Sequence, residues 1–168
     1  MLSMDHLLSP PTYRKIEEPI IFLAGPIQGA ANWQEKAIFH LSSAPFPYIA
    51  NPRRNIKWRG EFSPAMYDEQ VDWETHHLRL AAKQGVILFW LANEYKHRCE
   101  RAYAQTTRFE LGEWKIRHER DGVKLVVGID DNFSGKRYIQ RRFPNDCPDV
   151  PLCLTLEETC KRALELIS

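Results

Sequence analysis

GVILFWL, residues 85–91, is a continuous apolar run about as long as one β-strand. Similar runs lie within PIIFLA at residues 19–24 and KLVVGI at residues 124–129. Uninterrupted apolar runs are typical of strands that are buried on both faces, as in a parallel sheet. Segments of helical character separate these runs, and strands that alternate with helices form parallel sheets through right-handed crossovers. The sequence therefore predicts an α/β protein.

The remaining elements are predicted from spacing, caps and breakers. Short strands are expected at residues 46–50 and 150–154, helices at 33–43, 66–84, 107–120, 136–142 and 155–167, and loops at 51–64, 92–105 and 144–149. Thr155 with Glu158 is a capping pair for the last helix, and Asp121-Gly122 is a helix stop. We expect one domain at residues 19–168 with about five strands, preceded by a loose N-terminal arm at residues 1–18.

Composition and charge limit the classes of function. The chain has 168 residues, is 43% hydrophobic and 27% charged, and has a formal net charge of +1, which argues against a general nucleic-acid binder. Its four cysteines fit neither a CxxC zinc site nor a disulfide scaffold, so we expect reduced thiols. No apolar run reaches the ~20 residues of a membrane span, and residues 1–18 lack a signal-peptide pattern. We therefore expect a cytoplasmic protein that does not bind membranes.

TTRFELGEW, residues 106–114, places Glu110 near an expected helix start. One interpretation is a capping box, in which Thr107 caps the helix and Glu110 reaches back to its amide. The other is a carboxylate nucleophile, which the helix macrodipole would keep ionised at neutral pH. Carboxylate nucleophiles suit displacement at an anomeric carbon, where positive charge develops in the transition state. The pattern alone leaves both interpretations open.

YDEQVDWETHH, residues 67–77, is a second cluster of polar side chains. On a helix Asp68, Asp72 and His76 share one face, while Glu74 and His77 lie on another. The cluster is either a solvated acidic face near a helix start or part of a site. A metal site built from the first three is disfavoured, because first-row metals usually draw ligands from more than one element. We expect neither a metal nor a redox cofactor.

The turn GPIQG, residues 25–29, follows the first apolar run and matches neither GxGxxG nor a P-loop. It is either a plain turn or a set of backbone amides lining a pocket for a sugar, base or phosphate. Arg53 and Arg54 follow a strand end, where a guanidinium can bind a phosphate in bidentate fashion. Tryptophans usually pack in cores, and the alternative for one of them is stacking on a base. The tryptophan candidates are Trp33, Trp58, Trp73 and Trp90.

Five motifs occur in one order along the chain. They are FLAGPI at 22–27, NPRR at 51–54, YDEQVDWE at 67–74, ILFW at 87–90 and FELGEW at 109–114. Together they resemble the nucleoside 2-deoxyribosyltransferase-like family, within the wider group that includes nucleotide N-glycosidases. The resemblance covers about residues 21–129. It implies a flavodoxin-like (Rossmann-like) parallel sheet flanked by helices, and an enzyme that cleaves the N-glycosidic bond of a nucleoside or nucleotide.

The resemblance also implies roles for single residues. The family's glutamate nucleophile falls on Glu110, and its carboxylate on the preceding helix falls on Glu74, with Asp72 as the alternative because that helix is about one turn longer than usual. The family's Gly-Pro turn lines the sugar pocket and falls on Gly25, Pro26 and Ile27. We further expect substrate-binding roles for Gln28, Arg53, Asp68, His77, Trp90 and Gly112. Family members tend to assemble, so we expect a homo-oligomer.

Two departures from the family pattern bear on the substrate. Gln84-Gly85 stands where the family commonly has Ala-Asp, and the loop at residues 93–105 is longer and more basic. They leave open a catalytically inactive nucleotide-binding or sensing module on the same fold. The acceptor also stays open, since transfer to a second base or to water depends on how the site excludes water. A third and least favoured interpretation is that residues 53–59 and 136–142 bind single-stranded nucleic acid. Such binding would weaken steeply as the salt concentration rises.

Overall fold

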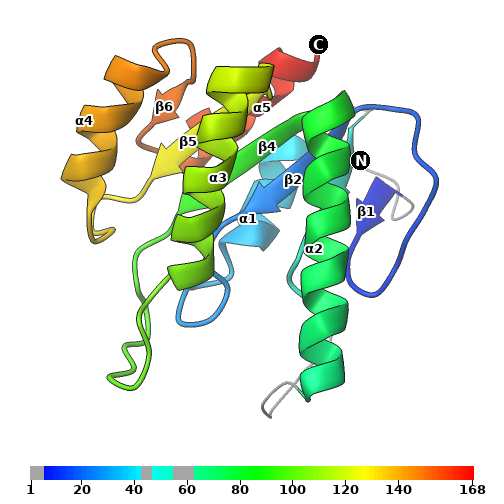
Figure 1. Cartoon of the computed structure of the whole chain (residues 1–168), viewed down its shortest axis with the longest axis horizontal. Helices are drawn as coiled ribbons and strands as arrows, with labels where there is room; N and C mark the ends of the chain where they lie inside the picture. Colours follow the sequence, from blue (N-terminus) through cyan, green and yellow to red (C-terminus); the bar gives the residue numbers. More distant parts are fainter. Residues whose placement is uncertain (1–5, 43–46, 55–62) are drawn as a thin grey trace.

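The computed structural model describes residues 6–42, 47–54 and 63–168. Its centre is a six-stranded parallel sheet with the strand order β1-β3-β2-β4-β5-β6 (Figure 1). The strands are β1 (Leu7–Leu8), β2 (Ile20–Ala24), β3 (Tyr48–Ala50), β4 (Val86–Leu91), β5 (Leu125–Ile129) and β6 (Leu152–Cys153). Without β1, this order is that of a flavodoxin-like sheet, so the predicted fold class is confirmed.

Helices cover both faces of the sheet (Figure 1). They are α1 (Trp33–Leu41), α2 (Pro64–Gln84), α3 (Gln105–Asp121), α4 (Lys136–Asp146) and α5 (Leu156–Ile167). On one face α2, α3 and α4 enclose a core that includes Phe22 and Phe89, and on the other α1 and α5 pack around Leu23 and Leu88. All residues of β2, β4 and β5 are buried, as the apolar runs predicted.

The N-terminal segment differs from the loose arm that we expected. Leu7 and Leu8 form β1, which pairs with β3 and extends the sheet by a sixth strand. Trp73 donates from Nε1 to the carbonyl of Thr12 at 2.7 Å. Gln84 donates from Nε2 to the carbonyls of Ile16 and Glu18, at 3.0 and 2.9 Å. The sequence did not predict β1 because a two-residue strand is too short to give a periodic pattern. The hydrogen bonds from Trp73 and Gln84 hold α2 against the segment that precedes β2.

The start of α3 also differs from the prediction. Ala104 precedes the helix in the left-handed conformation, with φ 56°, and no side chain caps the helix. The amide of Arg108 already donates to the carbonyl of Ala104, which starts the helix two residues before Thr107. The capping box of Thr107 and Glu110 is therefore not formed, and that interpretation is wrong.

The last two helices show one match and one difference. Thr155 accepts from the amide of Glu158 at 3.2 Å and caps α5, as predicted. In contrast, α4 continues through Pro144 to Asp146 instead of ending at residue 142. A proline loses only one helical hydrogen bond there, and the buried ring of Phe143 anchors the final turn.

Candidate active site

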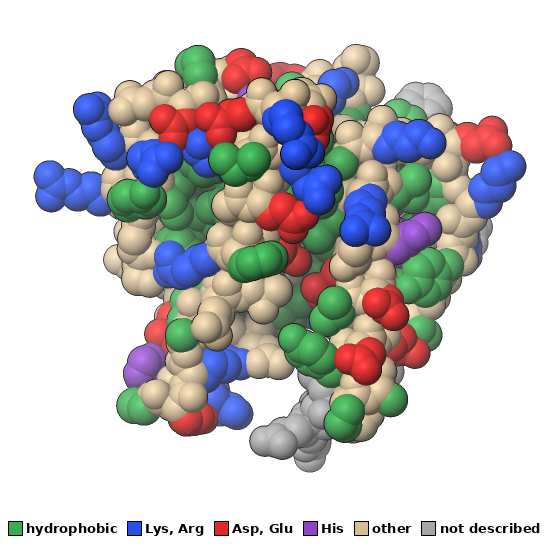
Figure 2. All heavy atoms as spheres, in the orientation of Figure 1, with side chains coloured by type: hydrophobic (Ala, Val, Ile, Leu, Met, Phe, Trp, Pro, Cys, Tyr) green, Lys and Arg blue, Asp and Glu red, His purple; other side chains and the backbone are tan. Residues whose placement is uncertain are grey.

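A groove of about 420 Å³ lies between α2 and α3. Figure 2 shows acidic side chains in the hollow between these two helices. The lining residues are Tyr67, Val71, Glu74, Thr75, Leu78 and Arg79 from α2, and Gln105, Thr106, Phe109, Glu110, Glu113 and Trp114 from α3. Both glutamates that the sequence singled out, Glu74 and Glu110, are therefore part of one groove.

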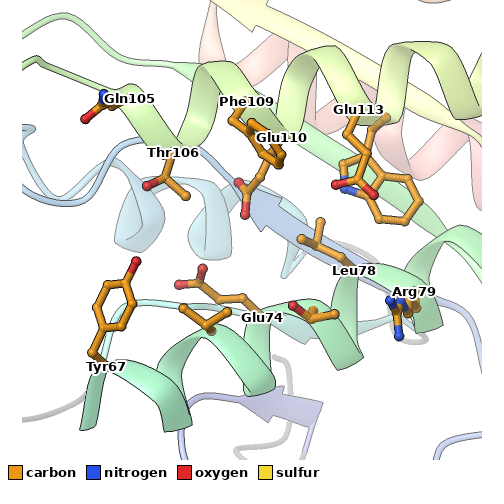
Figure 3. A pocket seen from close by; sticks show the side chains of 12 residues that line it. Tyr67, Glu74, Leu78, Arg79, Gln105, Thr106, Phe109, Glu110 and Glu113 are labelled. Atoms are coloured by element: carbon orange, nitrogen blue, oxygen red, sulfur yellow. The ribbon is translucent and has the colours of Figure 1, made fainter. Parts of the chain in front are cut away.

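The carboxyl groups of Glu74 and Glu110 point toward one another from opposite walls of the groove (Figure 3). Burial raises the pKa of Glu110 to about 8, and the negative charges of Glu74 and Glu113 add to this effect. Burial also raises the pKa of Glu74. Two carboxyl groups that share a partly buried site do not both ionise readily, so the pair retains a proton at neutral pH.

Glu74 is better stabilised as an anion than Glu110. The amide of Gln70 donates from Nε2 to Glu74 Oε1 at 2.7 Å, and the positive charge of Arg54 opposes the rise in the Glu74 pKa. Arg54 in turn donates from Nε to Gln70 Oε1 at 2.9 Å. Within the described part of the chain, no hydrogen bond reaches the Glu110 carboxyl group. The shared proton therefore resides on Glu110 rather than on Glu74.

The position of Glu110 in α3 explains why the helix does not keep it ionised. Because α3 begins at Gln105, Glu110 lies in its second turn. The macrodipole acts mainly on charges in the first turn. The expectation that the macrodipole favours the ionised form of Glu110 is therefore wrong, and burial beside Glu74 dominates.

The turn that begins at Gly25 leaves the carboxyl end of β2 and is tightly packed. A Cβ atom at Gly25 would lie 2.6 Å from the ring of Trp33 and would also overlap the carbonyl of Trp90, so a larger residue does not fit. Trp33 donates from Nε1 to the carbonyl of Pro26 at 2.9 Å. The predicted pocket residues Gly25 and Pro26 thus sit at the strand end, outside the set that lines the α2–α3 groove.

Arg53 holds the rest of this turn. It donates from Nε to Gln34 Oε1 at 3.0 Å and from Nη2 to the carbonyls of Ile27 and Ala31, at 3.4 and 3.5 Å. Gln34 is fully buried, which anchors the guanidinium between the turn and α1. These hydrogen bonds show that Arg53 stabilises the turn. Its role in phosphate binding stays a prediction.

The basic loop between β4 and α3 packs on the same turn. The amides of Tyr95 and Lys96 donate to the carbonyl of Gly29, at 2.7 and 3.0 Å. The guanidinium of Arg101 donates to the side-chain oxygen of Gln28. The loops that follow β2 and β4 are thus joined at the carboxyl edge of the sheet, where ligands of α/β proteins bind.

Three predicted site residues lie on exposed faces away from the groove. Asp68 and Asp72 are exposed on α2, and Asp72 leaves the helix nearly opposite to Glu74 because two residues span about 200°. Gly112 is exposed on α3, two residues from Glu110, and open space lies beside it. Of the two carboxylates considered on α2, the structure brings Glu74 and not Asp72 to Glu110.

Two other predicted residues are buried in different places. His77 is fully buried, its ring stacks on Trp73 at 4.0 Å, and its Nδ1 lies 2.8 Å from the Trp73 carbonyl oxygen. It also faces Tyr13 of the N-terminal segment, so it does not reach the groove. Trp90 belongs to the core on the α1–α5 face. Lys57, Trp58 and Arg59 lie outside the described residues.

The structure adds groove residues that had no assigned role. Tyr67 and Phe109 are 61% and 76% exposed, which is unusual for large apolar side chains, and they stand on opposite walls. Helical spacing from the two glutamates was the available signal, since Tyr67 lies seven residues before Glu74 and Trp114 lies four after Glu110. Side chains at these spacings share a helix face.

The fold and the facing carboxylates define a flavodoxin-like α/β protein with an acidic groove suited to a small polar molecule. Residues 18–132 match the family described as nucleoside 2-deoxyribosyltransferase like, so the chain belongs to this family and the resemblance is confirmed. Membership indicates nucleoside deoxyribosyltransferase-like activity and a nucleoside as the kind of substrate. A search of curated proteins finds no match.

Two further observations concern metals and membranes. In residues 6–42, 47–54 and 63–168, no group of three His, Cys, Asp or Glu side chains is placed to hold a metal ion. This includes Asp68, Asp72 and His76, which were considered as a metal site. None of the helices in these same ranges has the length and apolar character needed to cross a membrane.

Proposed function

We propose that this protein cleaves the N-glycosidic bond of a (deoxy)nucleoside or nucleotide and transfers the sugar to a second base or to water. The observation that carries the proposal is the pair of carboxyl groups of Glu74 and Glu110, which face one another in a groove of a nucleoside 2-deoxyribosyltransferase-like chain. Glu110 is the nucleophile and Glu74 is its partner. Cytoplasmic location and homo-oligomeric assembly stay predictions.

The proposed reaction begins with a proton transfer within the pair. The proton on Glu110 passes to Glu74, which leaves Glu110 as the anion. A carboxylate oxygen of Glu110 then bonds to C1′ of the sugar while the N-glycosidic bond breaks and its electron pair leaves with the base. Glu74 delivers its proton to the departing base. As the bond to the base breaks, the negative charge of the Glu110 carboxylate stabilises the positive charge that develops at C1′. The product is a neutral glycosyl ester of Glu110.

The second step decides between a transferase and a hydrolase. A second base or a water molecule attacks C1′ and releases Glu110, and Glu74 accepts the proton from this acceptor. A groove that holds the second base tightly and excludes water favours transfer. Tyr67 and Phe109 present exposed aromatic rings at the groove. A second base can stack on such rings, which favours transfer over hydrolysis.

The experiment is a free-base release assay. The protein is incubated with ribo- and deoxyribonucleosides and their monophosphates, with and without a second base, and the products are separated by chromatography. Glu110→Gln and Glu74→Gln are expected to lose turnover, while Asp72→Asn is the matched control because its exposed carboxylate lies on α2 but outside the groove. Asp72→Asn is expected to retain activity.

The outcomes separate the alternatives. Base release that disappears in Glu110→Gln but persists in Asp72→Asn supports the proposed nucleophile. Exchange that requires a second base indicates a transferase, and release without one indicates a hydrolase. Tight binding of a nucleotide by folded wild-type protein without any product would instead support an inactive binding or sensing module.

A further inference from the structure

Trp114 lies one helical turn beyond Glu110 on the same face of α3, and both line the groove. Residues four apart on a helix are neighbours on its surface. Long and aromatic side chains on helices lean back over the preceding turn, toward the N-terminus. This tendency would carry the indole of Trp114 toward the turn that holds Glu110.

The indole N–H of Trp114 is a donor without an acceptor. The side chain is 3% exposed, and Nε1 is buried with no hydrogen-bond partner in the described part of the chain. Trp33 and Trp73 differ, because each donates from Nε1 to a backbone carbonyl, at 2.9 and 2.7 Å. A buried N–H group that has lost water and gained no acceptor is unfavourable, so such groups are rare and call for an explanation.

The charges around this pair favour a movement of Glu110 once it is ionised. Glu74 on the opposite wall repels the anion, and Glu113 on the same helix adds to the repulsion. Glu113 is itself paired with Arg117 at 2.9 Å, and the Arg117 guanidinium lies 5.0 Å from the centre of the Trp114 ring. Rotation of the Glu110 side chain away from Glu74 therefore relieves like-charge repulsion.

We propose that Trp114 is a positioning residue: when Glu110 is ionised, its carboxylate turns away from Glu74 and accepts a hydrogen bond from the indole N–H of Trp114. This bond satisfies an otherwise orphaned donor and holds the anion that attacks C1′. Arg79, on the α2 wall, is a further positive charge on this groove. The role in catalysis rests on the proposed function, whereas the hydrogen bond itself requires no substrate.

The hydrogen bond is tested on the free protein by nitrogen-15 NMR. The indole N–H resonances are followed from about pH 6 to about pH 10, and the Trp114 signal is assigned by its loss in Trp114→Phe. We expect this signal to shift with the titration of Glu110 in wild-type protein and to stay constant in Glu110→Gln. If the chemical shift of the Trp114 indole N–H does not change with pH, or changes equally in Glu110→Gln, the proposal is overturned. This holds whether or not the protein has turnover.

The positioning role is tested by kinetics with Trp114→Phe, which keeps an aromatic ring and removes the N–H donor together with part of the buried ring volume. The pH dependence separates the two effects, because a packing loss does not depend on the ionisation of Glu110. We expect kcat/KM at neutral pH to fall roughly ten-fold. The loss should shrink at alkaline pH, where Glu110 is ionised in both proteins. The falling limb of the pH profile, which marks loss of the last proton from the Glu74–Glu110 pair, should move to higher pH in Trp114→Phe. An equal loss at every pH would mean that Trp114 serves packing alone. If wild-type protein releases no base, the proposed function fails while the NMR experiment still decides this inference.

Discussion

Glu110→Gln should make the folded protein more stable than wild type, and increasingly so at alkaline pH. The pKa of Glu110 is about 8 in the folded protein against an ordinary value of 4.5. Folded wild type thus binds more protons than the unfolded chain between these two values. The stability contributed by Glu110 is fully present below its unfolded pKa and is lost as pH rises through the folded pKa. Glutamine, which does not titrate, escapes this loss.

The size of the effect follows from the shift. A difference of about 3.5 pKa units at about 1.4 kcal/mol each sets an upper limit of ~5 kcal/mol, and partial exposure and coupling to Glu74 reduce it. We expect the advantage of Glu110→Gln over wild type to grow by ~2–4 kcal/mol between about pH 5 and about pH 8.5. Urea denaturation at several pH values measures it, with Asp72→Asn as the exposed control. Parallel stability curves for wild type and Glu110→Gln would refute the argument.

Three further variants test other parts of the site. Glu74→Gln should lower the apparent pKa of Glu110, because the charge of Glu74 raises this pKa more than the charge of Glu113 does. The kcat/KM profile of any residual activity should then move toward acid pH, and an unmoved profile contradicts the pairing. Arg53→Ala should weaken activity on nucleotides far more than on nucleosides, as the prediction that its guanidinium binds a phosphate requires. An equal loss on both would contradict phosphate binding and indicate that Arg53 only holds the Ile27 carbonyl. Gly25→Ala should lower thermal stability by ~1–3 kcal/mol, since the added methyl group meets Trp33, and an unchanged melting temperature would contradict this packing.

The apolar runs and the helix signals were sufficient to predict the sheet and most helices. Burial on both faces leaves a strong pattern in β2, β4 and β5, so these strands were found where they were expected. The edge strand β1 left no such pattern because it has two residues and only one neighbour. The start of α3 depends on the left-handed backbone of Ala104, which no local sequence rule requires of an alanine.

The site was predictable in part. The family motifs pointed to Glu110 and Glu74, and helical spacing was enough to place Asp72 on a different face of α2 from Glu74. Spacing does not reveal what lies opposite a face, so it missed that His77 packs on the N-terminal segment. A continuous apolar strand likewise does not show which face of the sheet each of its residues occupies. The sequence therefore did not reveal that Trp90 packs in the core between the sheet and helices α1 and α5. The raised pKa of Glu110 arises from burial and from the charge of Glu74, which is far from Glu110 in the sequence. Only folding brings these two residues to the same groove.

The bonds from Trp73 and Gln84 to the N-terminal segment have a practical consequence for handling this protein. They tie one side of α2 to residues 12–18, while another side of the same helix forms the groove wall that carries Glu74. Removing the first 18 residues to shorten the chain for expression would take away these acceptors and uncover the indole of Trp73. Such a truncation would act on the geometry of the carboxyl pair although it deletes no residue of the groove, so an inactive short form would be no argument against Glu74 or Glu110.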